Sequence, residues 1–201
     1  MFCETYWKIE AVFQYVSQNI RYMGLTTETV APGYEPHDVD ITFNNKYGVC
    51  RDKAALLAAM LRLAGFKAWP VIINAGPKKD PDVPQPYFNH AITCVENDDG
   101  SYTLMDSTDE TTRELLPAYL CDKSYLVAKP DGETLRTSPI VPASENMMRI
   151  KTTAKIEADG TLRGESTLLF EGINDNAYRS HLIKLKPDNR RDFFESKIKR
   201  S

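Results

Sequence analysis

Residues 47–57 read Tyr-Gly-Val-Cys-Arg-Asp-Lys-Ala-Ala-Leu-Leu and lead into an apolar segment that closes at Gly65. Apolar residues recur along it at helical spacing, on one side as Ala54, Leu57, Ala58, Leu61 and Ala64 and on the other as Leu56, Met60 and Leu63. This pattern predicts a helix that is buried on most of its surface. Cys50 falls at its first turn, where unpaired N–H groups and the helix dipole favour a thiolate. The stretch therefore predicts a reactive cysteine.

The alternative interpretation makes Cys50 a small apolar residue packed at a helix start. Two features of the flanking sequence weigh against it. Gly48 allows the backbone to turn tightly before the helix, and the polar residues 51–53 suggest that this end of the helix reaches solvent. We expect the Gly65 position to close the helix in a left-handed conformation.

The composition limits the possible classes of protein. A chain of 201 residues with 42% hydrophobic content can form one sizeable domain, or one domain and part of another. A net charge of -3 without a basic stripe argues against nucleic acid as a partner. No apolar run approaches the roughly 20 residues that a membrane-spanning helix needs, so no membrane span is expected in this chain. Residues 1–4 lack the layout of a secretion signal, which favours a piece of a longer protein over a cytoplasmic chain.

The remaining pattern up to residue 88 predicts elements that surround this helix. An amphipathic helix is expected over residues 5–21 and a long loop over 22–45, in which His37 is expected to be solvated. Residues 66–74 read as a strand that Pro70 places at a sheet edge or a bulge. The proline-rich residues 75–88 read as an exposed, extended loop whose last residues, Tyr87 and Phe88, could wall a cleft.

Residues 89–96 and 101–106 predict a β-hairpin. If its loop is Asp98, Asp99 and Gly100, residue i pairs with residue 198 minus i. Asp106 then faces Ile92 and lies diagonally beside His90 on the same face of the sheet. A loop of two or four residues would put these two side chains on opposite faces.

The segment after the hairpin changes character near residue 140. Short strands are expected near 124–128 and 133–136, and Pro139, Pro142 and Ser144 read as a linker. Residues 147–157 and 161–170 predict two further strands, and 175–200 a charged helical segment. We therefore expect a first domain over 1–140 and the start of an incomplete, β-rich second domain over 141–201, because two strands and a helix bury little by themselves.

Cys50, His90 and Asp106 supply the parts of nucleophilic acyl chemistry. The sulfur would attack a carbonyl, the histidine would carry the proton, and the aspartate would orient the ring. The backbone N–H of Cys50 could hold the developing oxyanion. A second donor is needed, for which Tyr22 is the first candidate and Asn89 the second.

A metal site is the competing chemical interpretation. Cys50, His90, Cys94 and Asp106 could converge, but their spacing matches no common zinc pattern, and the four cysteines have no Cys-x-x-Cys pair. We therefore predict neither a metal nor a cofactor. We expect Cys94 and Cys121 in the core, while a disulfide among Cys3, Cys94 and Cys121 stays open.

These residues resemble the transglutaminase-like superfamily, a branch of the papain-like cysteine hydrolases. The matching segments, which span about residues 5–140, are Asn19–Tyr22, Tyr47–Leu57, Leu61–Phe66, Phe88–Ala91 and Leu104–Thr108. The resemblance implies an α+β core in which a buried helix, carrying the cysteine at its N-terminal end, packs against an antiparallel sheet. The chain is most similar to bacterial multidomain members in which this module lies between β-rich domains, which implies a periplasmic or other extracytoplasmic location. Val49 stands where that subgroup usually has an acid, which leaves the substrate preference open.

Together these inferences predict a cysteine hydrolase that cleaves peptide or other amide bonds through a thioester, with a peptide or protein as its partner. Acyl transfer to an amine, as in a protein-glutamine transglutaminase, is the alternative within the enzyme class. A non-catalytic peptide-binding module that uses the proline-rich loop is the alternative from another class. The natural substrate and the oligomeric state stay open.

Overall fold

The computed structural model of the chain describes residues 2–25, 35–83 and 85–198. The chain divides into two compact units, Met1–Ile140 and Val141–Ser201, each of which is described by itself. Among the described residues, no helix is both long enough and apolar enough to cross a bilayer.

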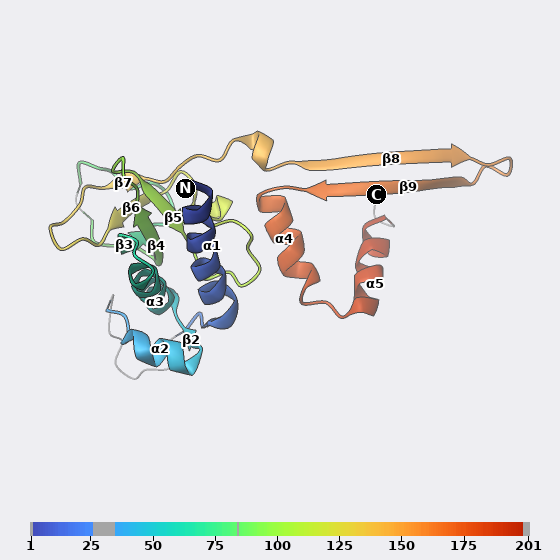
Figure 1. Cartoon of the computed structure of the whole chain (residues 1–201). Helices are drawn as coiled ribbons and strands as arrows, with labels where there is room; N and C mark the ends of the chain where they lie inside the picture. The colour runs from blue at the N-terminus through green and yellow to red at the C-terminus, as the bar shows by residue number, and fades with distance from the viewer. Residues whose placement is uncertain (1, 26–34, 84, 199–201) are drawn as a thin grey trace. The chain divides into compact units, whose positions relative to one another are not determined.

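The first unit is an α+β fold, as predicted (Figure 1). Its main sheet has the strand order β5-β4-β3-β6-β7 and is antiparallel throughout. A separate parallel pair joins β1 to β2. In chain order the elements are α1 (Phe2–Asn19), β1 (Arg21–Tyr22), α2 (Val39–Asn45), β2 (Tyr47–Gly48), α3 (Cys50–Leu63), β3 (Ala68–Ile73), β4 (His90–Glu96), β5 (Tyr102–Met105), the 3-10 turn η1 (Ala118–Leu120), β6 (Ser124–Val127) and β7 (Arg136–Thr137).

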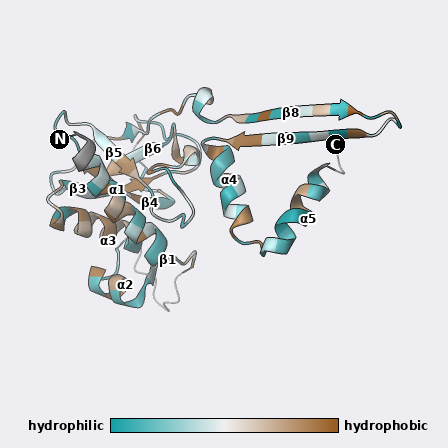
Figure 2. Cartoon of the chain, turned by 45° about the vertical axis from the view of Figure 1, so that its right-hand side comes forward, coloured by the Kyte–Doolittle hydropathy of each residue, from teal (hydrophilic) through white to brown (hydrophobic). Residues whose placement is uncertain are grey.

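Helices α1 and α3 form the core on one face of this sheet. Phe13 and Val16 of α1 and Leu57 and Leu61 of α3 are fully buried with strand residues such as Met105. Each such side chain contributes roughly 1.5–3 kcal/mol to folding. This burial explains the helical spacing of apolar residues in both segments, and Figure 2 shows α3 and the central strands as largely hydrophobic.

A second cluster fills the opposite face of the sheet. Val71 pairs with Ile92, and both belong to this cluster with Leu104, whereas Ala68 and Val95, which also pair, belong to the helix-covered face. Successive side chains of a strand point to opposite faces, so the sheet is buried on both sides.

The predicted hairpin register is confirmed. Thr93 pairs with Met105 and Glu96 pairs with Tyr102, so the two residue numbers of each pair add up to 198. Gly100 has φ of +78°, which a residue with a side chain rarely adopts. The predicted end of α3 is confirmed as well, because Gly65 has φ of +91°.

Three predictions about the first unit are corrected. The expected loop over 22–45 contains helix α2 and Tyr22, the second residue of β1, and its residues 26–34 lie outside the described part of the chain. Helix α2 spans only two turns, which is too short to show a helical period, and it packs against α3. Strand β3 is central in the sheet although it contains Pro70, since β6 pairs only with Val71–Ile73. The last strand is two residues long and begins at Arg136 rather than Glu133.

The second unit consists of a long hairpin followed by two helices. Its elements are the 3-10 turn η2 (Ala143–Glu145), β8 (Met148–Ile156), β9 (Leu162–Phe170), α4 (Ile173–Leu182) and α5 (Pro187–Ile198). The two strands pair along their full length, as predicted, and Phe170 stacks on Tyr178 of α4 with ring centroids 4.0 Å apart. Apolar residues of the hairpin such as Ile150 and Ile156 are exposed. That this unit begins an incomplete domain stays a prediction.

Candidate active site

Cys50 is the first residue of α3, as predicted. The parallel pairing of β1 with β2 fixes the chain just before it, with Tyr22 opposite Gly48. The Asp52 carboxylate accepts a hydrogen bond from the Val49 N–H at 3.0 Å and so occupies one of the unpaired donors at this helix start. The position of the thiol is therefore determined by both the strand pair and the first helical turn.

The Cys50 thiol has its pKa lowered from the usual value. Burial raises the pKa, but hydrogen bonding to the His90 ring, the charge of that ring, and the backbone N–H groups of Ala91 and Arg51 lower it by more. Each of these groups favours the thiolate. Cys50 thus has the electrostatic setting of a nucleophile.

His90, the first residue of β4, connects the thiol to a carboxylate. Its Nε2 lies 2.9 Å from Oδ2 of Asp106, which leaves Nδ1 for the sulfur of Cys50. Burial lowers the pKa of His90, but the hydrogen bonds and charges of Asp106 and Cys50 raise it to about 9. The imidazolium form therefore persists over the neutral pH range.

Asp106 is fully buried, and its pKa is nevertheless lowered. Burial raises the pKa, whereas the bonds from His90 and Thr108 lower it by more. The Thr108 N–H and Oγ1 donate to Oδ1 at 3.0 and 2.8 Å, and the Tyr119 hydroxyl donates to Oδ2 at 2.8 Å. Sequence reasoning missed Tyr119, which lies in η1, because nothing in its local pattern links it to Asp106 after the end of β5.

The two oxyanion candidates have different surroundings. Burial and the nearby charges of Cys50 and Asp106 raise the pKa of the Tyr22 phenol, which places its hydroxyl in the field of both groups. Asn89 instead uses its Oδ1 to accept the Ala75 N–H at 2.8 Å. The charges of Cys50 and Asp106 thus act on the Tyr22 phenol, whereas the Asn89 side chain is bonded to the loop after β3.

The polar residues after Cys50 were expected to reach solvent, but two of the three are buried. Asp52 and Lys53 are 3% and 0% exposed, and only Arg51 is partly exposed. The Lys53 ammonium donates to the backbone carbonyls of Ser17 and Ile20 at the end of α1. Burial lowers the pKa of Lys53, and nearby carboxylates such as Glu110 raise it by less, so that the pKa is about 8. Lys53 therefore joins α1 to α3 through the core.

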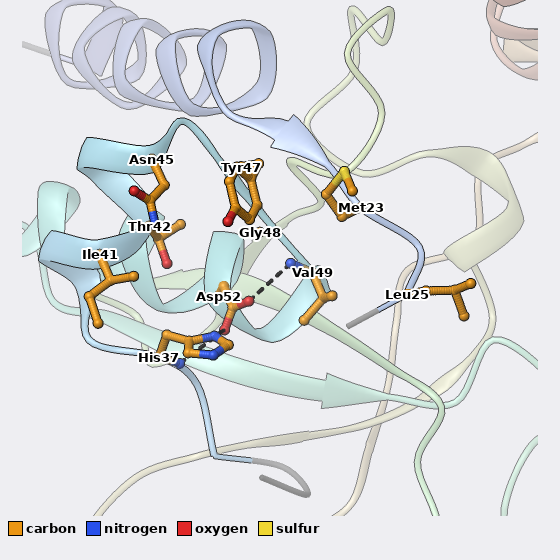
Figure 3. A pocket seen from close by; sticks show the side chains of 10 residues that line it. All are labelled: Met23, Leu25, His37, Ile41, Thr42, Asn45, Tyr47, Gly48, Val49 and Asp52. Carbon is orange, nitrogen blue, oxygen red and sulfur yellow. Dashed lines mark hydrogen bonds and ion pairs between the residues drawn. The ribbon is translucent and has the colours of Figure 1, made fainter. Parts of the chain in front are cut away.

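His37, which was expected to be solvated, is also engaged. Its N–H and its ring Nδ1 lie 3.0 and 3.1 Å from Oδ1 of Asp52. Figure 3 shows the ring beside Asp52. Both residues line a small cavity of about 90 Å³, together with residues such as Met23, Ile41 and Val49. Asp52 thus holds the segment before α2 as well as the start of α3.

In the part of the chain that the structure describes, no group of three or more His, Cys, Asp or Glu side chains could hold a metal ion. Cys50 and Cys94 carry free thiols. Cys94 is buried, as expected, and burial raises its pKa to about 12, whereas Cys121 is only partly buried. The side chain of Cys3 lies outside the described part of the chain.

The fold and site define a class: an α+β protein whose helix-borne cysteine meets a histidine and an aspartate from neighbouring strands. The family model of the transglutaminase-like superfamily matches residues 4–107. The chain therefore belongs to the transglutaminase-like superfamily, as its motifs predicted.

Two solved structures are similar to the chain. One is titled a "putative protease" from Parabacteroides distasonis ATCC 8503, with 18% identity, a TM-score of 0.51, and coverage of 77% of this chain and 31% of that one. The other is titled a "Putative Cysteine Protease" from Cytophaga hutchinsonii, with 25% identity, a TM-score of 0.38, and coverage of 56% and 32%. The match thus spans about a third of each of these longer chains. No curated protein matches the chain.

Proposed function

We propose that the first unit is a cysteine hydrolase that cleaves peptide or other amide bonds through a thioester. The observation that carries the proposal is the continuous connection from the Cys50 thiol through the His90 ring to the buried Asp106 carboxylate. The lowered pKa of Cys50 and the raised pKa of His90 both favour a thiolate beside an imidazolium. This pair is the reactive form of a cysteine nucleophile.

In the first half of the reaction the Cys50 thiolate attacks the carbonyl carbon and forms a C–S bond. The backbone N–H of Cys50 and the Tyr22 hydroxyl donate to the oxyanion. The His90 imidazolium then gives its proton to the amide nitrogen, the C–N bond breaks, and the amine leaves. Asp106 keeps the imidazole in the orientation and tautomer that this transfer needs.

In the second half neutral His90 removes a proton from water, and the hydroxide attacks the thioester. The C–S bond breaks, the carboxylic acid leaves, and the proton on His90 restores the ion pair. A primary amine in place of water would give acyl transfer instead. Access of water or amine to the thioester therefore decides between hydrolase and transglutaminase.

The test compares three forms of the full chain: the unchanged protein, Cys50→Ala and Cys121→Ala. We expect iodoacetamide to modify Cys50 faster than free cysteine at neutral pH, and peptide amides to be cleaved by the unchanged protein and by Cys121→Ala but not by Cys50→Ala. Mass spectrometry should detect the acyl group on Cys50. Addition of a primary amine distinguishes a transferred acyl group from a free acid. A Cys50 thiol no more reactive than free cysteine, with peptide binding retained in Cys50→Ala, would favour the binding module.

A further inference from the structure

A large apolar cavity lies beside the candidate active site on the helix-covered face of the sheet. Its volume is about 840 Å³, within the range of pockets that bind small ligands. Arg51 and Ala91, the chain neighbours of Cys50 and His90, both line it. A group held in this cavity is therefore close to the thiol.

The floor of the cavity is the part of this face that α3 leaves uncovered. Ile72 of β3 pairs with Ala91 of β4 and with Leu126 of β6, and all three line the cavity. Helix α3 lies over β4, where the Thr93 hydroxyl donates to the Ala54 carbonyl at 2.9 Å. Ala54 and Ala55 form the helix wall, and their small side chains leave the space open.

The proline-rich loop forms the roof. Pro81, Pro86 and Phe88 line the cavity from this loop, whereas Tyr87 is 76% exposed and is not part of the lining. The Lys79 N–H donates to Ser124 Oγ at 2.8 Å, and the Lys79 ammonium lies 4.9 Å from the centroid of the Phe88 ring.

Asn89 holds the other end of the same loop through its bond to the Ala75 N–H. The Lys79 bond thus attaches the loop to β6, and the Asn89 bond joins the two ends of the loop to each other. The cavity is thus formed before any ligand binds, which lowers the entropic cost of binding.

We infer that this cavity binds a bulky apolar side chain of a peptide substrate next to the scissile amide. This inference rests on the proposed hydrolase function. The walls are mostly apolar, while Arg51, Lys79, Asp80 and Gln85 add both donors and acceptors to the lining. A peptide backbone needs both kinds of partner, whereas a hydrocarbon chain needs neither.

The test measures kcat/KM for paired peptide amides that differ by Phe or Ala at one of the two positions flanking the scissile bond. Burial of the larger side chain should favour Phe about 10- to 100-fold at one of these positions. Ala128→Trp, which fills the cavity from the sheet, should remove this preference and leave cleavage of the Ala peptide within about twofold. Ala55→Leu fills it from α3 and serves as the second variant. Ala158→Trp, in the exposed β8–β9 turn, is the control.

Peptide binding to Cys50→Ala, read by fluorescence anisotropy, separates this inference from the proposed function. One outcome is that the Phe peptide binds more tightly than the Ala peptide, that Ala128→Trp abolishes this difference, and that the unchanged protein cleaves neither peptide. This outcome would support the cavity and overturn the hydrolase. Cleavage with no Phe preference at either position would overturn the cavity and keep the hydrolase. Preference for a long-chain N-acyl amide over the Phe peptide would also overturn the inference.

Discussion

His90 Nε2 lies 2.9 Å from Asp106 Oδ2, and the two residues come from the ends of neighbouring strands. The Asp106 carboxylate is fully buried and holds three further hydrogen bonds, from Thr108 and Tyr119. A buried carboxylate with this many donors stays ionised and cannot turn away from the ring. The relationship therefore sets both the orientation and the charge of His90.

The rate of Cys50 alkylation should depend on pH in two steps. The rate should begin to rise at a lower pH than the alkylation rate of free cysteine does, because the pKa of Cys50 is lowered. It should change again near pH 9, where His90 loses its proton. The rate of hydrolysis should give a bell-shaped curve against pH over the same range, because the reaction needs the thiolate and the imidazolium together. Timed alkylation with iodoacetamide measures the first profile, in a Cys3→Ala, Cys94→Ala and Cys121→Ala background that keeps Cys50 as the single thiol. A single step at the pKa of free cysteine would contradict it.

Asp106→Asn should narrow the pH range in which the protein hydrolyses its substrate, by lowering the upper limit of that range. The amide can still accept a bond from the ring, but it lacks the charge that raises the pKa of His90. The upper limb should therefore move from about pH 9 toward the ordinary histidine value, and hydrolysis at pH 8 should fall by about 10²–10⁴-fold. Tyr119→Phe, which removes one donor from Asp106 and keeps the His90 bond, should have a much smaller effect. An unmoved upper limb would show that Asp106 does not control the ring.

Tyr22→Phe should lower kcat with little change in KM. The hydroxyl is assigned to the oxyanion, which exists only after attack, so its loss should cost about 10²–10³-fold in kcat. Alkylation of Cys50 should stay nearly as fast, because no oxyanion forms in that reaction. Tyr47→Phe, on the adjacent strand β2, is the matched control. A change confined to KM would assign Tyr22 to substrate binding instead.

Gly48→Ala should displace the start of α3, whereas Gly24→Ala should not. A Cβ at Gly48 would lie 2.8 Å from Asp52 Cβ and 3.2 Å from Thr42 Cγ2, and one at Gly24 would meet nothing within 4 Å. Because Asp52 holds both Val49 and His37, its displacement should slow Cys50 alkylation and lower the free energy of unfolding by about 1–3 kcal/mol. Equal stability and alkylation rates for the two variants would contradict this account.

The sequence predicted the parts of the fold that depend on local pattern. Helix α3 follows from the period of its apolar residues, and the diagonal placement of Asp106 beside His90 follows from a three-residue loop that ends in Gly100. Both features depend on residues that are close in sequence.

Contacts between distant segments could not be predicted in this way. Asp52 and Lys53 resemble an exposed polar turn in sequence, but they bond to His37 and to the end of α1, which lie 15 and 33 residues away. Tyr119 reaches Asp106 only because the loop after β5 folds back over it, which no periodicity indicates. Such partners are fixed by packing and not by local propensity.

Lys53→Met should change how stability depends on pH. The Lys53 pKa is about 8 in the folded chain, against about 10.4 for an unperturbed lysine, so the unfolded state binds more protons between these values. The free energy of unfolding should therefore rise from pH 8 to 10.4 by up to about 3 kcal/mol through this group, and Lys53→Met should lose that rise. At pH 7 two effects oppose each other, because methionine removes the buried charge but leaves the Ser17 and Ile20 carbonyls without their donor. Urea unfolding across pH 7–10.5, with the exposed Lys67→Met as control, measures the difference. A constant difference between Lys53→Met and the unchanged protein over this range would show that the lysine titrates normally.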